Sequence, residues 1–272
     1  MQGNSQTGQR VEESVRSPIS EMPFIEHLRE LRTRILHGSI GILVGMILTY
    51  SWVELIFNFL SEPLRAAFAN LELIGTGPAD AFVCKLKVGI GKGILFSSPW
   101  LFYQVWLFVS PGLHESEKKF AIPFIALSTA LFLSGAAFCF YAVLPFAFSY
   151  FSDEFVSVGI KPTIRIGEYL GFVMKLCLVF GAVFELPVIF YFLARARLVT
   201  HTWLIKNFRY AVVLIFILAG ILTPPDVITQ CMLAGPLMII YGLSIWVTKF
   251  ANPQTRATAN PSAPPQSWSQ PK

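Results

Sequence analysis

The chain has 272 residues, of which 54% are hydrophobic and only 14% are charged. An average soluble domain carries about 25% charged residues, so this composition excludes a soluble globular protein and predicts an all-α polytopic membrane protein. The net charge of +5 requires no nucleic-acid partner, because membrane topology alone gathers cations at one surface.

The two ends of the chain differ from the apolar middle. Residues 1–21 are polar, lack the apolar core of a secretory signal peptide, and contain three glutamates, unlike an organelle transit peptide. We therefore expect a disordered cytoplasmic N-terminus without a cleaved targeting segment. Residues 251–272 are rich in Pro, Ser and Gln and bury too little apolar surface to fold, so they are expected to be a disordered cytoplasmic tail. The membrane domain then covers residues 22–250.

The segment MPFIEHLRELRTRIL, residues 22–36, precedes the first apolar run. Its apolar residues recur every three or four positions with charges between them, which predicts an amphipathic helix at the cytoplasmic surface. Two interpretations stay open. In the first, the arginines serve only to orient the first span, with Glu30 and Arg34 as an ordinary i,i+4 pair. In the second, Glu26 and Glu30, which share one face near His27, repel each other unless cations from the chain or from a ligand lie between them.

Six apolar runs are candidates for membrane spans. A helix needs about 17–25 residues to cross roughly 30 Å of hydrocarbon, and the runs are 35–53, 88–109, 121–150, 169–193, 210–223 and 227–247. The third is longer than a bilayer requires and should tilt or project. The fifth is short, about 21 Å as a helix, and the TPPD turn joins it directly to the sixth. This pair is expected to form an antiparallel hairpin that barely crosses the membrane.

Six spans place both ends of the chain on one side of the membrane, and the distribution of cations indicates which side. Lys175 lies within the fourth span, and fourteen of the other lysines and arginines fall on the side of the termini. The remaining six cations are on the opposite side, at Arg65, Lys85, Lys87, Lys92, Lys161 and Arg165. The positive-inside rule therefore predicts that both termini are cytoplasmic.

A second polar stretch, SPGLHESEKKF at residues 110–120, connects the second and third spans. Two carboxylates, Glu115 and Glu117, precede two lysines there. Taken alone, this stretch is typical of a solvated turn. It gains interest only if it faces the same surface as Glu30.

One carboxylate interrupts the fourth span, in LVFGAVFELPVIF at residues 178–190. Glu185 lies about 13 Å from the inner helix end, too deep for a short side chain to reach water. An ionisable residue there costs about 2.5–3.5 kcal/mol on insertion scales, so it should face protein or a wet cavity. Gly181 and Ala182 share its face and permit close approach of another helix. Pro187 predicts a kink beside the acid.

Three roles for Glu185 are considered. In the first it only ties helices together, and in the second it forms a polar docking point for a partner helix, with Thr223 and Gln230 as candidate partners across the bundle. The third role is the coupling acid of a proton-coupled secondary transporter or channel. Proton relays usually need several intramembrane acids or histidines, and the histidines of this chain lie at or near the cytoplasmic side, which weakens the third role.

No motif in the sequence indicates an enzyme. HExxH, GxSxG and the GxxxxGK[ST] phosphate loop are absent, and the four cysteines show no CxxC or CxxH spacing. We therefore expect no catalytic residue, no metal site and no cofactor.

Four separated motifs together resemble the TatC family, the multispanning core of the twin-arginine protein translocase. They are EHLRELRTR before the first span, YQVWLFVSPGL leading to HESEKK, FGAVFELP in the fourth span, and LTPPDVITQ, which includes Asp226, between the last two. The resemblance covers about residues 22–250, with the motifs in order. It implies a signal-peptide receptor in the bacterial or archaeal cytoplasmic membrane that exports folded proteins, driven by the proton motive force.

The resemblance also implies site residues and partners. The signal-binding glutamates correspond to Glu30 and Glu117, Arg32 belongs to the first motif, and Phe108 is the aromatic residue before the loop. Pro63 matches the proline of the first outer loop, and Leu28 joins Phe24 and Phe108 in a predicted apolar ridge for the signal. Glu185, Thr223 and Gln230 match polar positions that meet partner helices. The implied partners are twin-arginine signal peptides, TatA-like and TatB-like single-span subunits, other TatC copies and the lipid bilayer.

Overall fold

The structure is a computed structural model that describes residues 22–68, 72–75, 77–110, 121–196, 198–223 and 226–251. The predicted disordered segments before residue 22 and after residue 251 lie outside the described residues. So does the loop of residues 111–120, which carries Glu117.

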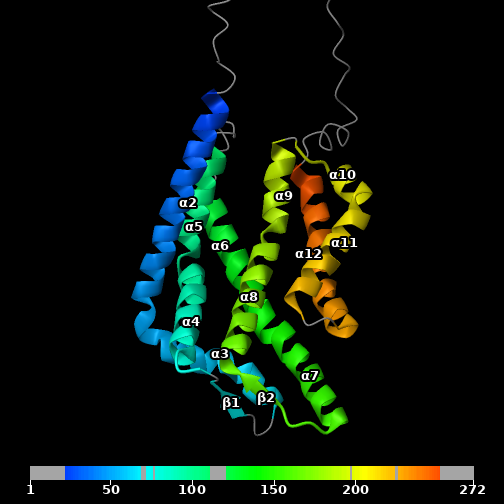
Figure 1. Cartoon of the computed structure of the whole chain (residues 1–272). Helices are drawn as coiled ribbons and strands as arrows, with labels where there is room; N and C mark the ends of the chain where they lie inside the picture. The colour runs from blue at the N-terminus through cyan, green and yellow to red at the C-terminus, as the bar shows by residue number, and fades with distance from the viewer. Residues whose placement is uncertain are drawn as a thin grey trace, which may run out of the picture.

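The described chain is almost entirely helical, which confirms the predicted all-α class, and its long helices run side by side (Figure 1). The helical elements are α2 (Met22–Leu48), η1 (Tyr50–Trp52), α3 (Val53–Ala67), α4 (Asp80–Phe96), α5 (Ser98–Val109), α6 (Ala121–Phe138), the π-helix η4 (Cys139–Val143), α7 (Leu144–Val158), α8 (Ile166–Phe184), α9 (Leu186–Arg195), α10 (His201–Lys206), α11 (Phe208–Leu222) and α12 (Val227–Ala251). Two short strands, β1 (Glu72–Ile74) and β2 (Thr163–Arg165), pair in parallel.

Each of the six predicted spans corresponds to a helix or a chain of helices. Among the described residues, four continuous helical segments are long and apolar enough to cross a membrane: Glu26–Leu48, Ala121–Val158, Ile166–Arg195 and Val227–Ala251. The second predicted span is the pair α4 and α5, and the fifth is the short apolar helix α11. Helices α11 and α12 pack against each other as the predicted hairpin.

Prolines account for the interruptions within these spans. Pro99 removes the backbone donor that would reach the Leu95 carbonyl, and the Ser98 hydroxyl donates to that carbonyl at 2.7 Å instead. The prediction of one unbroken second span over 88–109 was therefore wrong, because the helix begins at Asp80 and breaks at Ser97. Pro145 likewise lies in the first turn of a helix, α7, which directly follows the π-helix η4. Pro236, in contrast, lies inside the continuous helix α12.

Two features near the first span differ from expectation. The amphipathic segment is not a separate surface helix but the first turns of α2, which runs without a break from Met22 to Leu48. The chain then forms α3, an unpredicted helix that contains the buried Pro63. The Tyr169 hydroxyl donates to the Leu60 carbonyl at 2.5 Å and so anchors α3 to α8.

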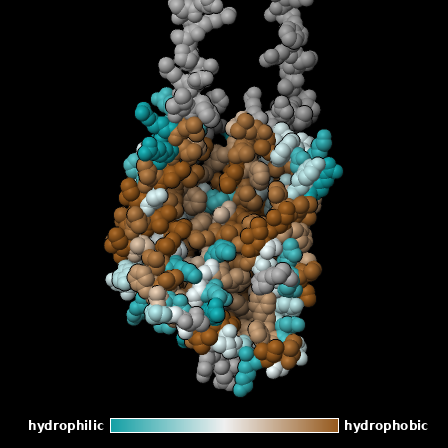
Figure 2. Space-filling view, viewed as in Figure 1, coloured by the Kyte–Doolittle hydropathy of each residue, from teal (hydrophilic) through white to brown (hydrophobic). Residues whose placement is uncertain are grey.

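The bundle has two distinct ends (Figure 1). The start of α2 and the end of α12 lie together at what we call the terminal end, whereas α3, β1 and β2 lie at what we call the strand end. In the face shown in Figure 2, hydrophobic side chains cover the upper and middle parts, and hydrophilic ones collect towards the strand end and at the terminal rim. This banding is expected of a protein that spans a bilayer.

Candidate functional site

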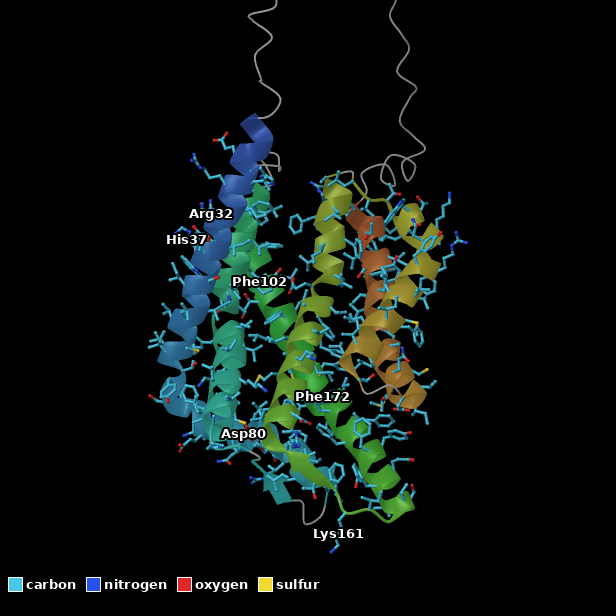
Figure 3. The ribbon with its side chains drawn as sticks, in the orientation of Figure 1. Arg32, His37, Asp80, Phe102, Lys161 and Phe172 are labelled. Carbon is cyan, nitrogen blue, oxygen red and sulfur yellow. The ribbon has the colours of Figure 1, made fainter. Side chains whose placement is uncertain are left out.

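The first group of candidate residues lies on α2 at the terminal end, where Figure 3 shows Arg32 and His37 on the same stretch of helix, far from Asp80 and Lys161. Leu28 and Arg32 are exposed, and Glu30 is half-buried. Glu30 Oε1 accepts a hydrogen bond from Arg34 Nη2 at 3.1 Å, an i,i+4 ion pair. The cation that relieves repulsion at this face therefore comes from the same helix.

Aromatic contacts hold this part of α2 against α5. The His27 ring stacks on the Phe108 ring with a centroid distance of 4.4 Å and an interplanar angle of 22°. Further along α2, Trp100 Nε1 donates to the His37 carbonyl at 3.0 Å. Phe108 lies within the last turn of α5, so the end of α5 at Val109 lies beside the turn of α2 that carries His27 and Glu30.

A groove of about 310 Å³ runs between α2 and α5 below this contact. Leu31, Arg34 and Phe108 line its end nearest the terminus, and Gln104 lies deeper. Gln104 is buried, and its Oε1 accepts no hydrogen bond within the described structure. Of the predicted apolar ridge, the structure thus places Phe108 at a groove, Leu28 on the exposed surface, and the Phe24 side chain outside the described residues.

Glu185 lies at the junction between α8 and α9, where the predicted kink is confirmed. The Glu185 amide donates to the Ala182 carbonyl at 3.2 Å, a tighter turn than an α-helix makes, and α9 restarts with Pro187 in its first turn. The residue is only 6% exposed. A carboxylate in the middle of a spanning segment is thereby enclosed by protein on most sides.

The surroundings of the Glu185 carboxyl are polar but leave one oxygen without a hydrogen bond. Ser128 on α6 and the backbone of Phe132 are the groups that interact with the carboxyl. Within the described structure, however, Glu185 Oε1 and the Ser128 hydroxyl are buried and form no hydrogen bond of normal geometry. A buried polar group without a partner costs about 1–3 kcal/mol, so this oxygen favours a hydrogen-bond donor, either the Ser128 hydroxyl or a group of another molecule.

Two glycines explain how α6 and α8 approach closely enough to bury this acid. A Cβ atom added to Gly181 would lie 2.7 Å from Phe132 Cε2, and one added to Gly135 would lie 2.7 Å from the Phe180 carbonyl oxygen. Both distances are too short for any larger residue. The predicted role of Gly181 in close helix approach is therefore confirmed.

A second groove, of about 420 Å³, opens beside Glu185 between α5, α6 and α9. Its walls are apolar, with Phe102, Phe132, Val188 and Phe192 among them, and of the described residues that line it, Glu185 alone is ionisable. An apolar groove with a single acid at its base suits a transmembrane helix that carries one polar side chain.

The candidate partners of Glu185 lie elsewhere. Gln230 Nε2 donates to the Phe216 carbonyl at 2.8 Å, and the Thr223 hydroxyl donates to the Ala219 carbonyl at 2.9 Å. Both bonds are internal to the α11–α12 hairpin, and no described hydrogen bond joins either side chain to Glu185. The predicted pairing across the bundle is therefore not formed. Gly220 leaves space for Gln230, whose Nε2 would lie 3.1 Å from an added Cβ.

Asp226 has a structural task at the start of α12. Its carboxylate accepts hydrogen bonds from the Ile228 amide at 3.1 Å, the Thr229 amide at 3.0 Å, and the Thr229 hydroxyl. This is an N-cap, which satisfies donors that the first turn of a helix leaves unpaired. The Thr229 hydroxyl, followed by the backbone amides, lowers the pKa of Asp226 from its ordinary value.

Lys92 is a residue whose position the sequence interpretation missed. Charge counting groups it with the cations of the outer side, but it is only 6% exposed, and its ammonium donates to the Thr49 carbonyl just after the end of α2. A cation at a helix C-terminus gains about 0.3–1 kcal/mol, less than the 2.5–3.5 kcal/mol that a charged residue in the bilayer costs. The sequence pattern that could have indicated its burial is a lysine between two glycines inside an apolar run, GIGKGIL.

The chain is similar to known proteins over most of its length. The family model "Sec-independent protein translocase protein (TatC)" matches residues 26–236. A relative named Sec-independent protein translocase protein TatC from Desulforapulum autotrophicum is 44% identical over 224 residues, which cover 82% of this chain and 83% of the relative. The relative of the same name from Carboxydothermus hydrogenoformans is 40% identical and covers 86% and 95%.

A solved structure agrees with these relatives. The crystal structure described as "Crystal Structure of Twin Arginine Translocase Receptor- TatC" matches with a TM-score of 0.76 and 33% identity, covering 83% of this chain and 99% of the other. These similarities give no support to the alternative of a proton-coupled transporter. By sequence and by fold, this chain belongs to the TatC family of Sec-independent protein translocases.

Proposed function

We propose that the chain is the signal-peptide receptor of a twin-arginine translocation complex, with its terminal end at the cytoplasmic face of the membrane. The excess of lysine and arginine on the side of the termini supports this orientation. The similarity to a crystal structure of a twin-arginine translocase receptor supports the role. Transport of folded cargo is then driven by the proton motive force, as the family resemblance implies.

Recognition of the signal rests on two carboxylates. An arginine guanidinium offers a planar fork of donors that a carboxylate accepts in two parallel hydrogen bonds, so a twin-arginine motif calls for two acids. Glu30 supplies one and Glu117 the other. The observation that carries this proposal is the His27–Phe108 stack, because it holds the Glu30 segment of α2 against the end of α5 from which the Glu117 loop departs.

Arg34 gives the receptor a resting partner for Glu30. Their ion pair is partly exposed, with 27% of each side chain accessible, and pairs of this kind contribute only about 0.3–0.5 kcal/mol. A guanidinium from a signal peptide can therefore replace Arg34 at little cost. The groove lined by Leu31 and Phe108 lies directly below and accepts apolar residues that follow the two arginines.

Binding of a twin-arginine peptide to the purified protein tests the recognition site. Glu30→Gln and Glu117→Gln keep the shape of each side chain and remove its charge, and each should weaken binding by roughly tenfold or more, the loss of one charge-assisted hydrogen bond. The double variant should bind the twin-arginine peptide no more tightly than the wild-type protein binds a twin-lysine peptide. Glu168→Gln is the matched control, since Glu168 also forms an exposed ion pair, with Arg165, at the strand end. Unchanged affinity in the two single variants and the double variant would refute the site.

Glu185 serves a different step in this proposal, the docking of a single-span TatA-like or TatB-like subunit. Its unpaired Oε1 at the base of an apolar groove offers the missing hydrogen bond to a polar group on the partner helix. Thr223 and Gln230 form a separate polar patch on the short hairpin, where the membrane is thinnest. If Glu185→Ala leaves both partner crosslinking and export unaltered, the acid only ties α6 to α8.

A further inference from the structure

Lys92 and its surroundings form a site that the signal receptor and partner docking do not use. A groove of about 410 Å³, which we call the Lys92 groove, is lined by the segment that follows α2 and by residues of α3, α4, α5 and α6. Its walls include Ile56, Leu95 and Leu133, and its rim carries Trp52 and Phe96, which are 58% and 56% exposed. The groove is therefore apolar in its walls and open to whatever surrounds the protein.

The Lys92 ammonium has donor capacity to spare in this groove. An ammonium has three donors, and one of them reaches the Thr49 carbonyl. The two hydroxyls in the lining are already engaged, since the Thr49 hydroxyl donates to the Gly45 carbonyl at 2.6 Å and the Ser98 hydroxyl to the Leu95 carbonyl at 2.7 Å. The hydrogen-bond donors that the lining side chains still offer a ligand are thus those of the Lys92 ammonium, which also carries the positive charge.

Charge in the groove is not balanced by the protein around it. Among the described residues, no Asp or Glu lines the groove, and Lys92 takes part in none of the ion pairs found in the described ranges. A nearly buried cation with apolar walls and unused donors favours an anionic partner in addition to the Thr49 carbonyl. Because the lining has no acid to receive an ammonium, a ligand with a net negative charge fits better than a zwitterionic one.

The depth of Lys92 indicates which anion can reach it. Lys85 lies seven residues earlier on the same helix, about 10 Å away, and its exposed ion pair with Glu54 belongs at the polar surface of the strand end. Trp52, at the rim, is of the residue type that sits at headgroup level. The long lysine side chain reaches this level from just inside the hydrocarbon.

We propose that the Lys92 groove binds an anionic phospholipid of the leaflet at the strand end, with its phosphate on the Lys92 ammonium and an acyl chain along Ile56, Leu95 and Leu133. The lipid then completes the junction between α2 and α4, because the same ammonium holds the carbonyl that directly follows α2.

Native mass spectrometry of the purified full chain tests this site, with phosphatidylglycerol and phosphatidylcholine of identical acyl chains as probes. The wild-type protein should retain phosphatidylglycerol preferentially. Lys92→Gln should weaken that retention by roughly tenfold or more, the effect of losing one charge-assisted hydrogen bond, and Lys92→Arg should keep it. Lys175→Gln is the matched control, because Lys175 is an exposed lysine on α8 within another span.

Two results would overturn the proposal. One is equal retention of both lipids by the wild-type protein, which can be judged even if Lys92→Gln does not fold. The other is a photoreactive residue at Phe96 that crosslinks in native membranes to a protein rather than to lipid, which would assign the groove to a partner helix carrying a carboxylate. Thermal unfolding is measured with and without phosphatidylglycerol. The change in melting temperature that Lys92→Gln causes without lipid reports on the Thr49 contact, and the further rise that phosphatidylglycerol adds reports on the lipid site.

Discussion

Two glutamates of this chain, Glu30 and Glu185, occupy opposite environments. Glu30 lies at the terminal end, partly exposed, and already pairs with Arg34 one turn away on the same helix. Glu185 lies at the break between α8 and α9, 6% exposed, with an oxygen that no described group satisfies. An exposed pair exchanges partners at little energetic cost, whereas a buried acid without a partner favours any ligand that supplies one.

The difference suits the two tasks we propose for them. A receptor must release its signal peptide, so a carboxylate that returns to its own arginine is advantageous. A docking point within the membrane must discriminate among apolar helices, and one unsatisfied polar group does so because a partner without a matching group leaves it unpaired. Substitutions that loosen the packing around Glu185, remove its carboxyl, or remove Arg34 from Glu30 test whether this difference matters.

The largest effect is expected from Gly135→Ala, which forces α6 away from α8. The added Cβ would lie 2.7 Å from the Phe180 carbonyl oxygen, a backbone atom that cannot move aside. We expect a loss of about 1–3 kcal/mol of unfolding free energy, measured by unfolding in detergent. Gly242→Ala is the control, because an added Cβ there meets no atom of a neighbouring element within 4 Å, and it should gain about 0.5–1 kcal/mol. Equal stability of the two variants would contradict the close crossing.

Glu185→Leu tests whether the acid is kept at the expense of stability. Replacing a buried, incompletely satisfied carboxyl by an apolar side chain of similar size should raise the unfolding free energy by about 1–3 kcal/mol, while partner crosslinking falls. Glu30→Leu should change stability by no more than about 0.5 kcal/mol. If Glu185→Leu lowers stability instead, the carboxyl is a structural tie and not a docking point.

Asp226 adds a third environment, a carboxylate fully engaged in a helix cap. Its folded-state pKa is lowered, chiefly by the Thr229 hydroxyl, so its contribution to stability is complete above the unfolded pKa of about 3.9 and is lost as the pH falls through the lower folded value. Asp226→Asn keeps the cap without the titration. The thermal stability of the wild-type protein relative to this variant should therefore decline only in acid, below about pH 3.9.

The sequence predicts a structural feature well when the residues that cause it are close together in the chain. The kink at Glu185 depends on Pro187, and the close approach of α6 and α8 depends on Gly181. Both residues lie within one segment of sequence, so both features are predictable. The amphipathic start of α2 is recognisable, but its continuity with the first span is not, because periodicity does not show where a helix passes from water into lipid. Helix α3 escapes prediction because its buried apolar face packs mainly against α7 and α4, which are distant in the sequence.

Long-range contacts account for the remaining errors. Thr223 and Gln230 look like partners of Glu185 because all three are polar within apolar helices, yet each finds a backbone carbonyl on its own hairpin. Lys92 falls among the exposed cations because charge counting does not register burial. The carbonyl that holds it belongs to Thr49, 43 positions away in the chain.

The smallest effect is expected from Arg34→Gln, which tests whether Arg34 competes with the signal peptide for Glu30. The substitution removes the resting partner of Glu30, so a signal arginine no longer competes with an ion pair worth about 0.3–0.5 kcal/mol. Affinity for a twin-arginine peptide should rise by roughly twofold, measured by titration at low salt. High salt should erase the difference, because screening weakens the exposed pair in the wild-type protein as well.

Arg29→Gln is the control for the general loss of one positive charge on α2, since Arg29 is exposed and Glu30 pairs with Arg34 instead. If Arg34→Gln weakens binding, Arg34 is part of the recognition surface and orients Glu30 towards the signal. The direction of the change therefore separates a competitor from a positioning residue, even though its size is small.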